Sequence, residues 1–187
     1  MKVSIIAITF GLLALGVFLN RPSPETTIGA ETDFNRLSEK FLRNIEAGKD
    51  TQAFQDRLAH TTIDSLVNAL TTDNQKLAFW VNIYNAYIQI ILTKNPELYK
   101  DRSSFFTKDQ ITIAGQKVSF ATIEHGIIRK SQWDKGLGYV QDPFPGDFER
   151  KLRVDNRNYH IHFALNCGAK DCPPVAVYQP DRLKEQF

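Results

Sequence analysis

The stretch LAFWVNIYNAYIQIIL, residues 77–92, decides the fold of this chain. As a helix it makes about four turns, and apolar side chains fall on nearly every side of them. Such a helix belongs at the centre of a core, because a surface helix keeps one polar face. We expect Asp73 or Asn74 to cap its start and Asn95-Pro96 to end it.

Two shorter amphipathic patterns precede the central helix. The first begins near Thr32-Asp33 and ends at Gly48, a residue suited to the C-terminus of a helix. The second places Ile63, Leu66 and Leu70 at helical spacing. The N-terminal half of the domain is therefore expected to be helical.

The pattern changes from helical to alternating after the central helix. Residues 111–113 and 118–120 alternate around Ala114-Gly115-Gln116, which predicts a β-hairpin. A short helix is expected over 123–128. Glycines and prolines in the polar stretch 133–147 then predict a long loop.

A last alternating segment completes the pattern. It runs from Leu152 to Leu165 and predicts a further strand with His160 and His162 on one face. Asp181 is expected to open a final helix. Helices followed by a few antiparallel strands favour an α+β fold. We expect a single domain over 32–187, in which a helical N-terminal half packs on a small antiparallel sheet.

The N-terminus reads as a transmembrane or signal segment that precedes this domain. After Lys2 the stretch 3–19 carries no charge, as in a secretory signal or a signal-anchor. The apolar run continues past Ala14-Leu15-Gly16, its one small-residue cleavage pattern, which favours an uncleaved anchor over residues 1–20. Residues 21–31 then form a linker. With Lys2 in the cytoplasm, the domain would lie on the extracytoplasmic side.

The composition limits the class of protein. The chain has 187 residues, of which 42% are hydrophobic and 24% charged, as in a globular protein. The 23 Lys and Arg against 21 Asp and Glu give a net charge of +2. So balanced a charge, with no basic run, gives no reason to expect nucleic acid as a partner.

Three stretches stand out together: AFWVNIYNA at 78–86, IEHGIIR at 123–129 and HFALNCGAKDCPP at 162–174. In this order and spacing they resemble the domain-of-unknown-function 547 family from about Leu66 to the end. Members of that family often carry Ser where this chain has Asp171. Its domain usually continues past the Pro-Pro pair with a further helix, which implies more chain beyond Phe187. The resemblance supplies positions to test and no reaction.

Cys167 and Cys172 are the two cysteines of the chain. Outside the cytoplasm such a pair predicts a structural disulfide. A disulfide goes with a non-enzymatic interaction domain, whose protein or small-molecule partner the sequence does not identify. A redox role is less favoured, because the spacing C-x₄-C is not the C-x-x-C of thiol oxidoreductases.

The second interpretation makes one of the two thiols a nucleophile. A cysteine nucleophile needs a base, usually His, and an orienting Asn, Asp or Glu. The three stretches offer His162 or His125 as the base and Glu124 to orient it. This composition is typical of a papain-like or transglutaminase-like site. It predicts a cysteine-dependent hydrolase or acyl-transferase in which Cys167 or Cys172 attacks.

A third interpretation is a zinc site that adds His160 and His162 to the two cysteines. The spacing H-x-H-x₄-C-x₄-C is not an established ligand pattern, so neither a metal nor another cofactor is expected.

Other polar residues of the three stretches have structural explanations. Asn82 and Asn85 are expected to bond to loop backbone, because buried amides need partners. Arg129 follows Glu124 by five residues, a spacing that does not favour an ion pair on an α-helix. Trp133 and Phe144 either pack into the core or cover the edge of a site.

Overall fold

The structure, a computed structural model, describes residues 33–133, 140–168, 172 and 174–187. The expected N-terminal membrane or signal segment and the linker behind it lie outside these residues. Within the described ranges no helix is both long enough and apolar enough to cross a membrane.

The central helix is confirmed as α4, Asp73–Lys94, and its side chains are buried without a break from Leu77 to Ile88. The predicted cap is wrong. Thr72 caps α4 through a capping box with Gln75, in which each side chain accepts a hydrogen bond from the other's backbone. Asp73 instead uses its carboxylate to accept the backbone N–H groups of Asp155 and Asn156.

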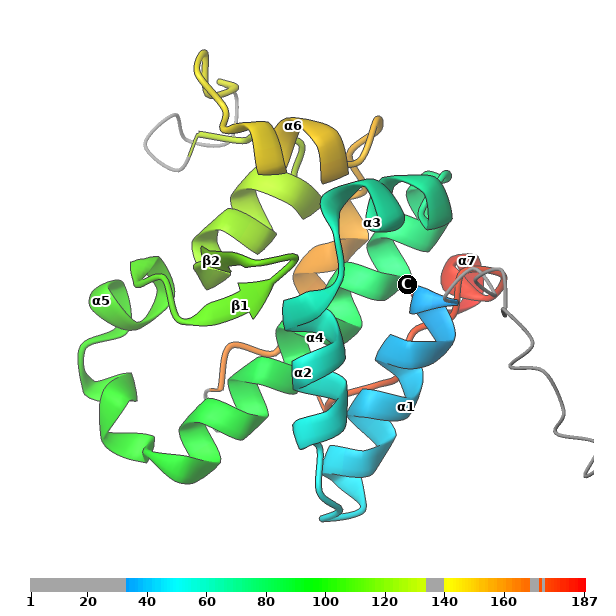
Figure 1. Cartoon of the computed structure of the whole chain (residues 1–187). Coiled ribbons are helices and arrows are strands. Elements are labelled where there is room, and N and C mark those ends of the chain that lie inside the picture. Colours follow the sequence, from blue (N-terminus) through cyan, green and yellow to red (C-terminus); the bar gives the residue numbers. More distant parts are fainter. Residues whose placement is uncertain (1–32, 134–139, 169–171, 173) are drawn as a thin grey trace, which may run out of the picture. The chain divides into compact units, whose positions relative to one another are not determined.

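Helix α1, Phe34–Glu46, packs along α4 (Figure 1). It begins after its cap Asp33 and stops before Gly48, whose φ of 64° is the left-handed conformation expected there. Helices α2, Gln52–His60, and α3, Ile63–Ala69, follow. The sequence pattern predicted α1 and α3 and missed α2, which buries little more than Leu58.

The hairpin is confirmed as strands β1, Ile111–Ile113, and β2, Gln116–Val118, with Ile111 opposite Val118. The second strand lies two residues earlier than predicted, because Gln116 pairs with Ile113 and does not belong to the turn. Two elements that the sequence pattern did not predict lie between α4 and the hairpin, the 3₁₀ helix η1, Pro96–Lys100, and α5, Arg102–Thr107. Both turn residues, Ala114 and Gly115, have positive φ, as a two-residue hairpin turn requires.

The prediction of a strand over 152–165 was wrong. Helix α6, Asp147–Leu152, opens this region, and Tyr159–Phe163 forms the 3₁₀ helix η4. Asn158 caps η4 by accepting the N–H of His160. The apolar alternation was misleading, because Ile161 is buried whereas the side chains of Tyr159 and Phe163 are 76% and 71% exposed. The domain is thus helix-rich α+β, with one two-stranded antiparallel sheet among the described residues.

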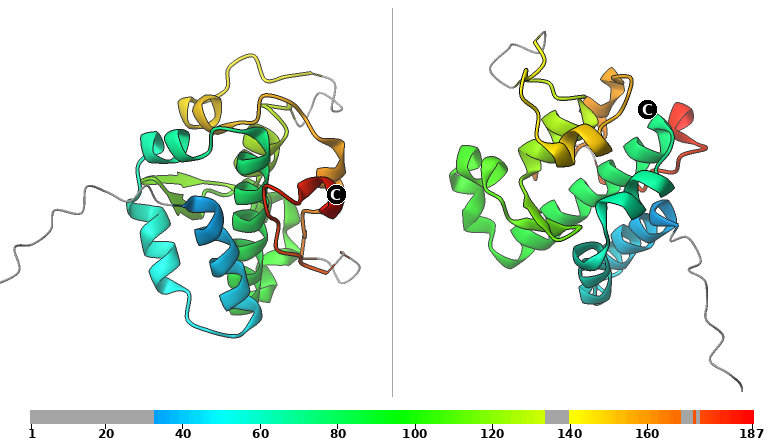
Figure 2. Two further views of the ribbon diagram at one scale, coloured as in Figure 1. Left: turned by 90° about the vertical axis from the view of Figure 1, so that its right-hand side faces the viewer. Right: turned by 45° about the horizontal axis from the view of Figure 1, so that its top comes forward.

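The C-terminal segment runs back beside α4 and ends in helix α7, Leu183–Gln186, as expected after Asp181 (Figure 2). Asn82 of α4 anchors it: its Nδ2 donates to the carbonyl of Tyr178 and its Oδ1 accepts the N–H of Tyr178, both at 2.8 Å. The amide of Asn82 therefore pairs with backbone, as its burial predicted.

Candidate functional site

The loop that carries the cysteines is fixed to α4 by Asn85. Asn85 Nδ2 donates to the carbonyl of Ala164, and its Oδ1 accepts the N–H of Asn166, each at 2.9 Å. Asn85 is completely buried. Together with Asn82 three residues earlier, it gives α4 a polar face that binds mainly backbone, with one further hydrogen bond from Asn82 Nδ2 to Ser38 Oγ at 3.3 Å. The expectation that these amides serve the core is confirmed, and they place Cys167 immediately after a fixed residue.

Gly168 allows the same loop to approach α4 closely. Its φ is 79°, and a Cβ at this position would lie 2.4 Å from Cδ1 of Leu92. A side chain would therefore meet both backbone strain and a clash. Glycine at 168 thus allows the backbone that follows Cys167 to lie against the C-terminal half of α4.

Cys167 and Cys172 are both half-buried thiols in the structure. Tyr99 O–H donates to Cys167 Sγ at 3.8 Å, and the backbone N–H of Cys167 donates to Cys172 Sγ at 3.3 Å. The spacing C-x₄-C therefore folds one sulfur onto the backbone of the other cysteine. Tyr99, from η1, is a site residue that the sequence analysis missed, because it lies outside the three stretches.

Glu124 lies in η2, Thr122–Ile128, and Arg129 is the residue that follows this helix. Their side chains form an ion pair. Nε and Nη2 of Arg129 donate to Glu124 Oε1 at 3.1 and 2.9 Å. Their side chains are only 21% and 12% exposed, respectively. The expectation that five residues of separation disfavour the pair was wrong, because η2 is a π-helix. Its i→i+5 hydrogen bond, from Arg129 N–H to the Glu124 carbonyl, brings these side chains together.

Tyr84 contacts this ion pair and lies near Cys167. Its O–H donates to Glu124 Oε2 at 3.3 Å. The pKa of Tyr84 is raised far above its ordinary value of 10.0, chiefly by burial, then by the Glu124 carboxylate, and further by the nearby Cys167. Burial and the hydrogen bond to Cys167 likewise raise the pKa of Tyr99. Two neutral phenols therefore stand beside the half-buried sulfur.

His162 contacts Arg129 on the exposed side of the ion pair. Nη1 and Nη2 of Arg129 each lie 3.0 Å from a ring nitrogen of His162. A neutral imidazole accepts at one nitrogen only, so one of the two contacts is a hydrogen bond. The structure thus directs His162 to Arg129, not to a sulfur.

His125, although adjacent to Glu124, belongs to different surroundings. It lines a cavity of about 200 Å³ together with Trp133, Asp142 and Glu149. The structure therefore divides the expected residues between two places. Cys167, Cys172, Glu124 and His162 surround Tyr84, Tyr99 and Arg129, and His125 lies elsewhere.

The metal interpretation has no geometric support in the described ranges. His160 and His162 lie on a 3₁₀ helix, where residues two apart do not share a face. No three His, Cys, Asp or Glu side chains among the described residues are grouped to hold a metal ion.

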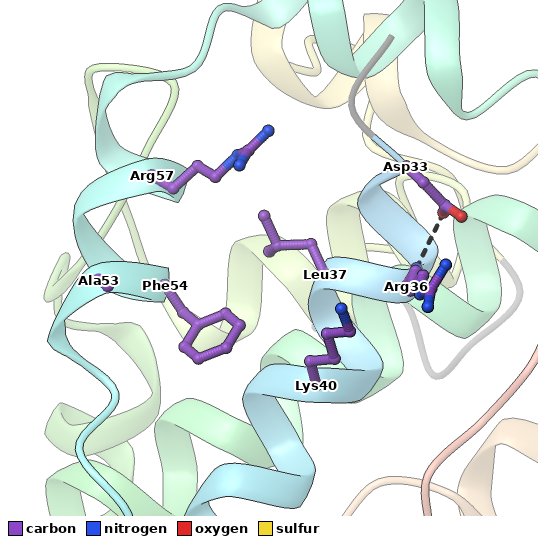
Figure 3. A pocket seen from close by; sticks show the side chains of 7 residues that line it. All are labelled: Asp33, Arg36, Leu37, Lys40, Ala53, Phe54 and Arg57. Atoms are coloured by element: carbon purple, nitrogen blue, oxygen red, sulfur yellow. Dashed lines mark hydrogen bonds between the residues drawn. The ribbon is translucent and has the colours of Figure 1, made fainter. Parts of the chain in front are cut away.

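A second hollow of about 370 Å³ lies between α1 and α2 (Figure 3). Leu37 and Phe54 form its apolar floor, and Lys40 and Arg57 extend over it. No expected site residue lines this groove. The sequence analysis did not find it, because α2 forms one of its walls and was not predicted.

The family model described as "Protein of unknown function, DUF547" matches residues 67–187. No curated protein and no solved structure matches the chain. The matched span contains every residue expected at the site, and it leaves α1, α2 and the groove between them outside.

Proposed function

Because the chain belongs to the DUF547 family of proteins of unknown function, we propose an activity from its own geometry: a cysteine-dependent hydrolase or acyl-transferase whose nucleophile is Cys167. The observation that carries the proposal is the position of the Cys167 thiol. Asn85 and Gly168 fix its loop on α4, Tyr99 donates to its sulfur, and a partly buried ion pair contacts Tyr84.

Cys167 is the better nucleophile of the two cysteines for a physical reason. The O–H of Tyr99 is donated to its sulfur, and a hydrogen bond to sulfur favours the thiolate, which is the reactive form. The sulfur of Cys172 instead accepts a backbone N–H within the loop. Cys172 thereby supports the backbone that presents Cys167.

The chemistry follows from the neighbours of the thiol. Glu124 receives the thiol proton through the hydroxyl of Tyr84, which already donates to that carboxylate. Sulfur attacks the acyl carbon, an S–C bond forms, and the leaving group departs with the proton. Water or an acceptor then breaks the S–C bond, and a proton returns to sulfur.

His162 and Arg129 act as a pair in this scheme. The guanidinium of Arg129 supplies positive charge near the developing anion. His162, through its two contacts with the guanidinium, holds it in place. This assigns the basic role, which the sequence analysis gave to a histidine, to Glu124, since His162 is engaged by Arg129.

A disulfide-stapled interaction domain without enzymatic activity is the second candidate. It is favoured by the contact of Cys172 Sγ with the Cys167 amide, which brings the two cysteines within reach of each other. In either case we propose that residues 3–19 anchor the chain in a membrane with the domain on the extracytoplasmic side. The charge-free run behind Lys2 supports this placement.

Acyl capture tests the enzymatic proposal. The full chain, kept reduced, is incubated with 4-nitrophenyl acetate, followed by intact mass and peptide mapping. One acetyl group on Cys167 that later disappears by hydrolysis is expected. Cys167→Ser should abolish this capture and Cys172→Ser should retain it. Glu124→Gln should slow it more than His162→Ala does. Equal acetylation of both cysteines, at the rate of the urea-unfolded chain, would reject the nucleophile.

A further inference from the structure

The cavity beside His125 has a lining that the proposed thiol chemistry does not use. It holds about 200 Å³, the space of six or seven water molecules at about 30 Å³ each. It lies where η2, α6 and the chain on either side of residues 134–139 meet. Thr122, His125, Gln132, Trp133, Asp142 and Glu149 carry its polar and aromatic groups.

Backbone hydrogen bonds join the two chain segments that carry Trp133 and Asp142 to each other. Gln132 and Gln141 form an antiparallel bridge. The N–H of Trp133 donates to the Val140 carbonyl at 2.9 Å, and the N–H of Asp142 donates to the Ser131 carbonyl at 2.8 Å. Both side chains therefore face the cavity from a fixed backbone.

The lining contains two carboxylates, those of Glu149 and Asp142. Glu149 lies flat on η2, where a Cβ on Gly126 would be 2.7–2.9 Å from its side-chain atoms. Among the described residues its carboxylate makes no hydrogen bond or ion pair. Asp142 uses one oxygen to accept the Phe144 N–H at 2.8 Å.

Three arginines that belong to or follow η2 and α6 are engaged elsewhere, and Lys151 of α6 does not line the cavity. Arg129 pairs with Glu124, Arg150 pairs with Asp147, and Arg153 donates to Ser131 Oγ at 2.7 Å. The described part of the lining therefore carries the charges of Asp142 and Glu149 with no Lys or Arg to balance them.

His125 and Trp133 add the features of a ligand site. Nδ1 of His125 is buried and, in the part of the chain that the structure describes, has no hydrogen-bond partner. An unpaired buried polar atom is costly, so the ring would gain by turning Nδ1 toward an N–H donor of a ligand in the cavity. Trp133 leaves 43% of its surface exposed over the cavity, and an indole face attracts cations.

We propose that this cavity binds a small organic cation with N–H donors, a primary ammonium or a guanidinium. Its charge matches Asp142 and Glu149, its N–H groups match the carboxylate oxygens and the His125 nitrogen, and Trp133 covers it. A quaternary ammonium would leave those acceptors unpaired. A metal ion does not fit, because no three described His, Cys, Asp or Glu groups converge. This proposal does not rest on the thiol chemistry.

Calorimetric titration of the full chain with butylguanidine and with butylammonium tests the proposal. Saturable binding of at least one of them is expected, with tetramethylammonium and butyrate binding at least about tenfold more weakly. Binding should also change the fluorescence of Trp133, since the other tryptophan, Trp80, is fully buried. Acetyl-arginine amide as a third probe distinguishes the sources. Tighter binding than butylguanidine indicates a peptide side chain, and weaker binding indicates a free small molecule.

Two variants and one control connect the binding to this cavity. Glu149→Gln and Asp142→Asn should each weaken binding about tenfold, because each removes one charge and keeps the shape. Gly126→Ala should weaken it as well, since the new Cβ displaces the Glu149 side chain without removing its charge. Asp147→Asn, an exposed neighbour on α6, should leave binding unchanged.

Circular dichroism and the thermal midpoint confirm folding of each variant before titration. Absence of saturable binding to folded wild-type protein would overturn the proposal. So would affinities for butylguanidine and tetramethylammonium that are equal, or that do not change in Glu149→Gln.

Discussion

Asn85 and Asn166 lie 81 residues apart in sequence and are joined by a 2.9 Å hydrogen bond from the Asn166 N–H to Asn85 Oδ1. The same Asn85 amide donates to the Ala164 carbonyl. A buried helix thus supplies, from one side chain, the two hydrogen bonds that a neighbouring β-strand would give to the loop. This contact positions the thiol of Cys167 without a sheet.

Replacement of Asn85 by Ala should therefore destabilise the domain strongly. Two backbone groups would lose their partners at about 1–3 kcal/mol each, so the free energy of unfolding should fall by about 2–6 kcal/mol in urea titration. Asn68→Ala, on the exposed face of α3, is the matched control and should change it by less than about 0.5 kcal/mol. Equal effects of the two variants would contradict the role of Asn85.

Gly168→Ala should lower the free energy of unfolding more than Gly48→Ala does, although both glycines have positive φ. The strain of the left-handed backbone, about 1 kcal/mol, is common to both. At 168 the added Cβ also meets Leu92, whereas at 48 nothing lies within 4 Å. Denaturant unfolding should show the difference, and Leu92→Ala combined with Gly168→Ala should cost less than the sum of the two single changes. Additive costs would contradict the clash.

The sequence predicted the elements whose cause is local. The apolar run of α4, the turn at Ala114-Gly115 and the stop at Gly48 each need only the pattern along the chain. The strand over 152–165 failed because alternation does not reveal burial. Ile161 enters the core while Tyr159 stays in solvent, a difference decided by what α4 leaves uncovered.

The sequence predicted which residues belong to the candidate site but not how they are arranged. The three stretches contain Glu124, His162 and both cysteines, which the structure places around Tyr84 and Arg129. Glu124 and His125 face different surroundings because η2 is a π-helix, and the pattern of residues along the chain does not predict a π-helix. Tyr99 carries no motif, and its place beside Cys167 depends on η1 folding back from α4. Tertiary contacts decided these points.

Arg129→Ala should destabilise the protein, because Glu124 would keep its charge in a site where it is only 21% exposed. Loss of one partner of a fully buried pair costs about 3–5 kcal/mol, and the partial exposure here reduces this to about 2 kcal/mol. The exposed pair of Arg150 with Asp147 is the control, and Arg150→Ala should cost less than about 1 kcal/mol. Thermal and urea unfolding measure both. A neutral Arg129→Ala would contradict the buried pair.

Stability should fall as the pH rises above the ordinary tyrosine pKa of 10.0. Burial raises the pKa of Tyr84, Tyr87, Tyr99 and Tyr178. Below that pH both the folded and the unfolded state hold the phenolic protons, so the ionisation of the tyrosines does not change the stability. Above it the unfolded chain releases protons that the folded chain retains, which favours unfolding.

Absorbance of tyrosinate at alkaline pH checks this prediction. Unfolding in urea near pH 11 should increase the tyrosinate signal, and Tyr84→Phe should make the increase smaller. Identical tyrosinate absorbance in folded and unfolded protein would contradict the burial of these phenols.

The reactivity of the two thiols tests the nucleophilic role of Cys167 most directly. The full chain is isolated without reductant, its thiols are counted, and it is alkylated with limiting iodoacetamide at mildly acidic pH before peptide mapping. The account predicts two free thiols, with Cys167 modified faster than Cys172 and faster than either cysteine of the urea-unfolded chain. Tyr99→Phe should slow Cys167. A protein with no titratable thiol and a mass lower by two hydrogens, or a Cys167 no faster than in the unfolded chain, would contradict it.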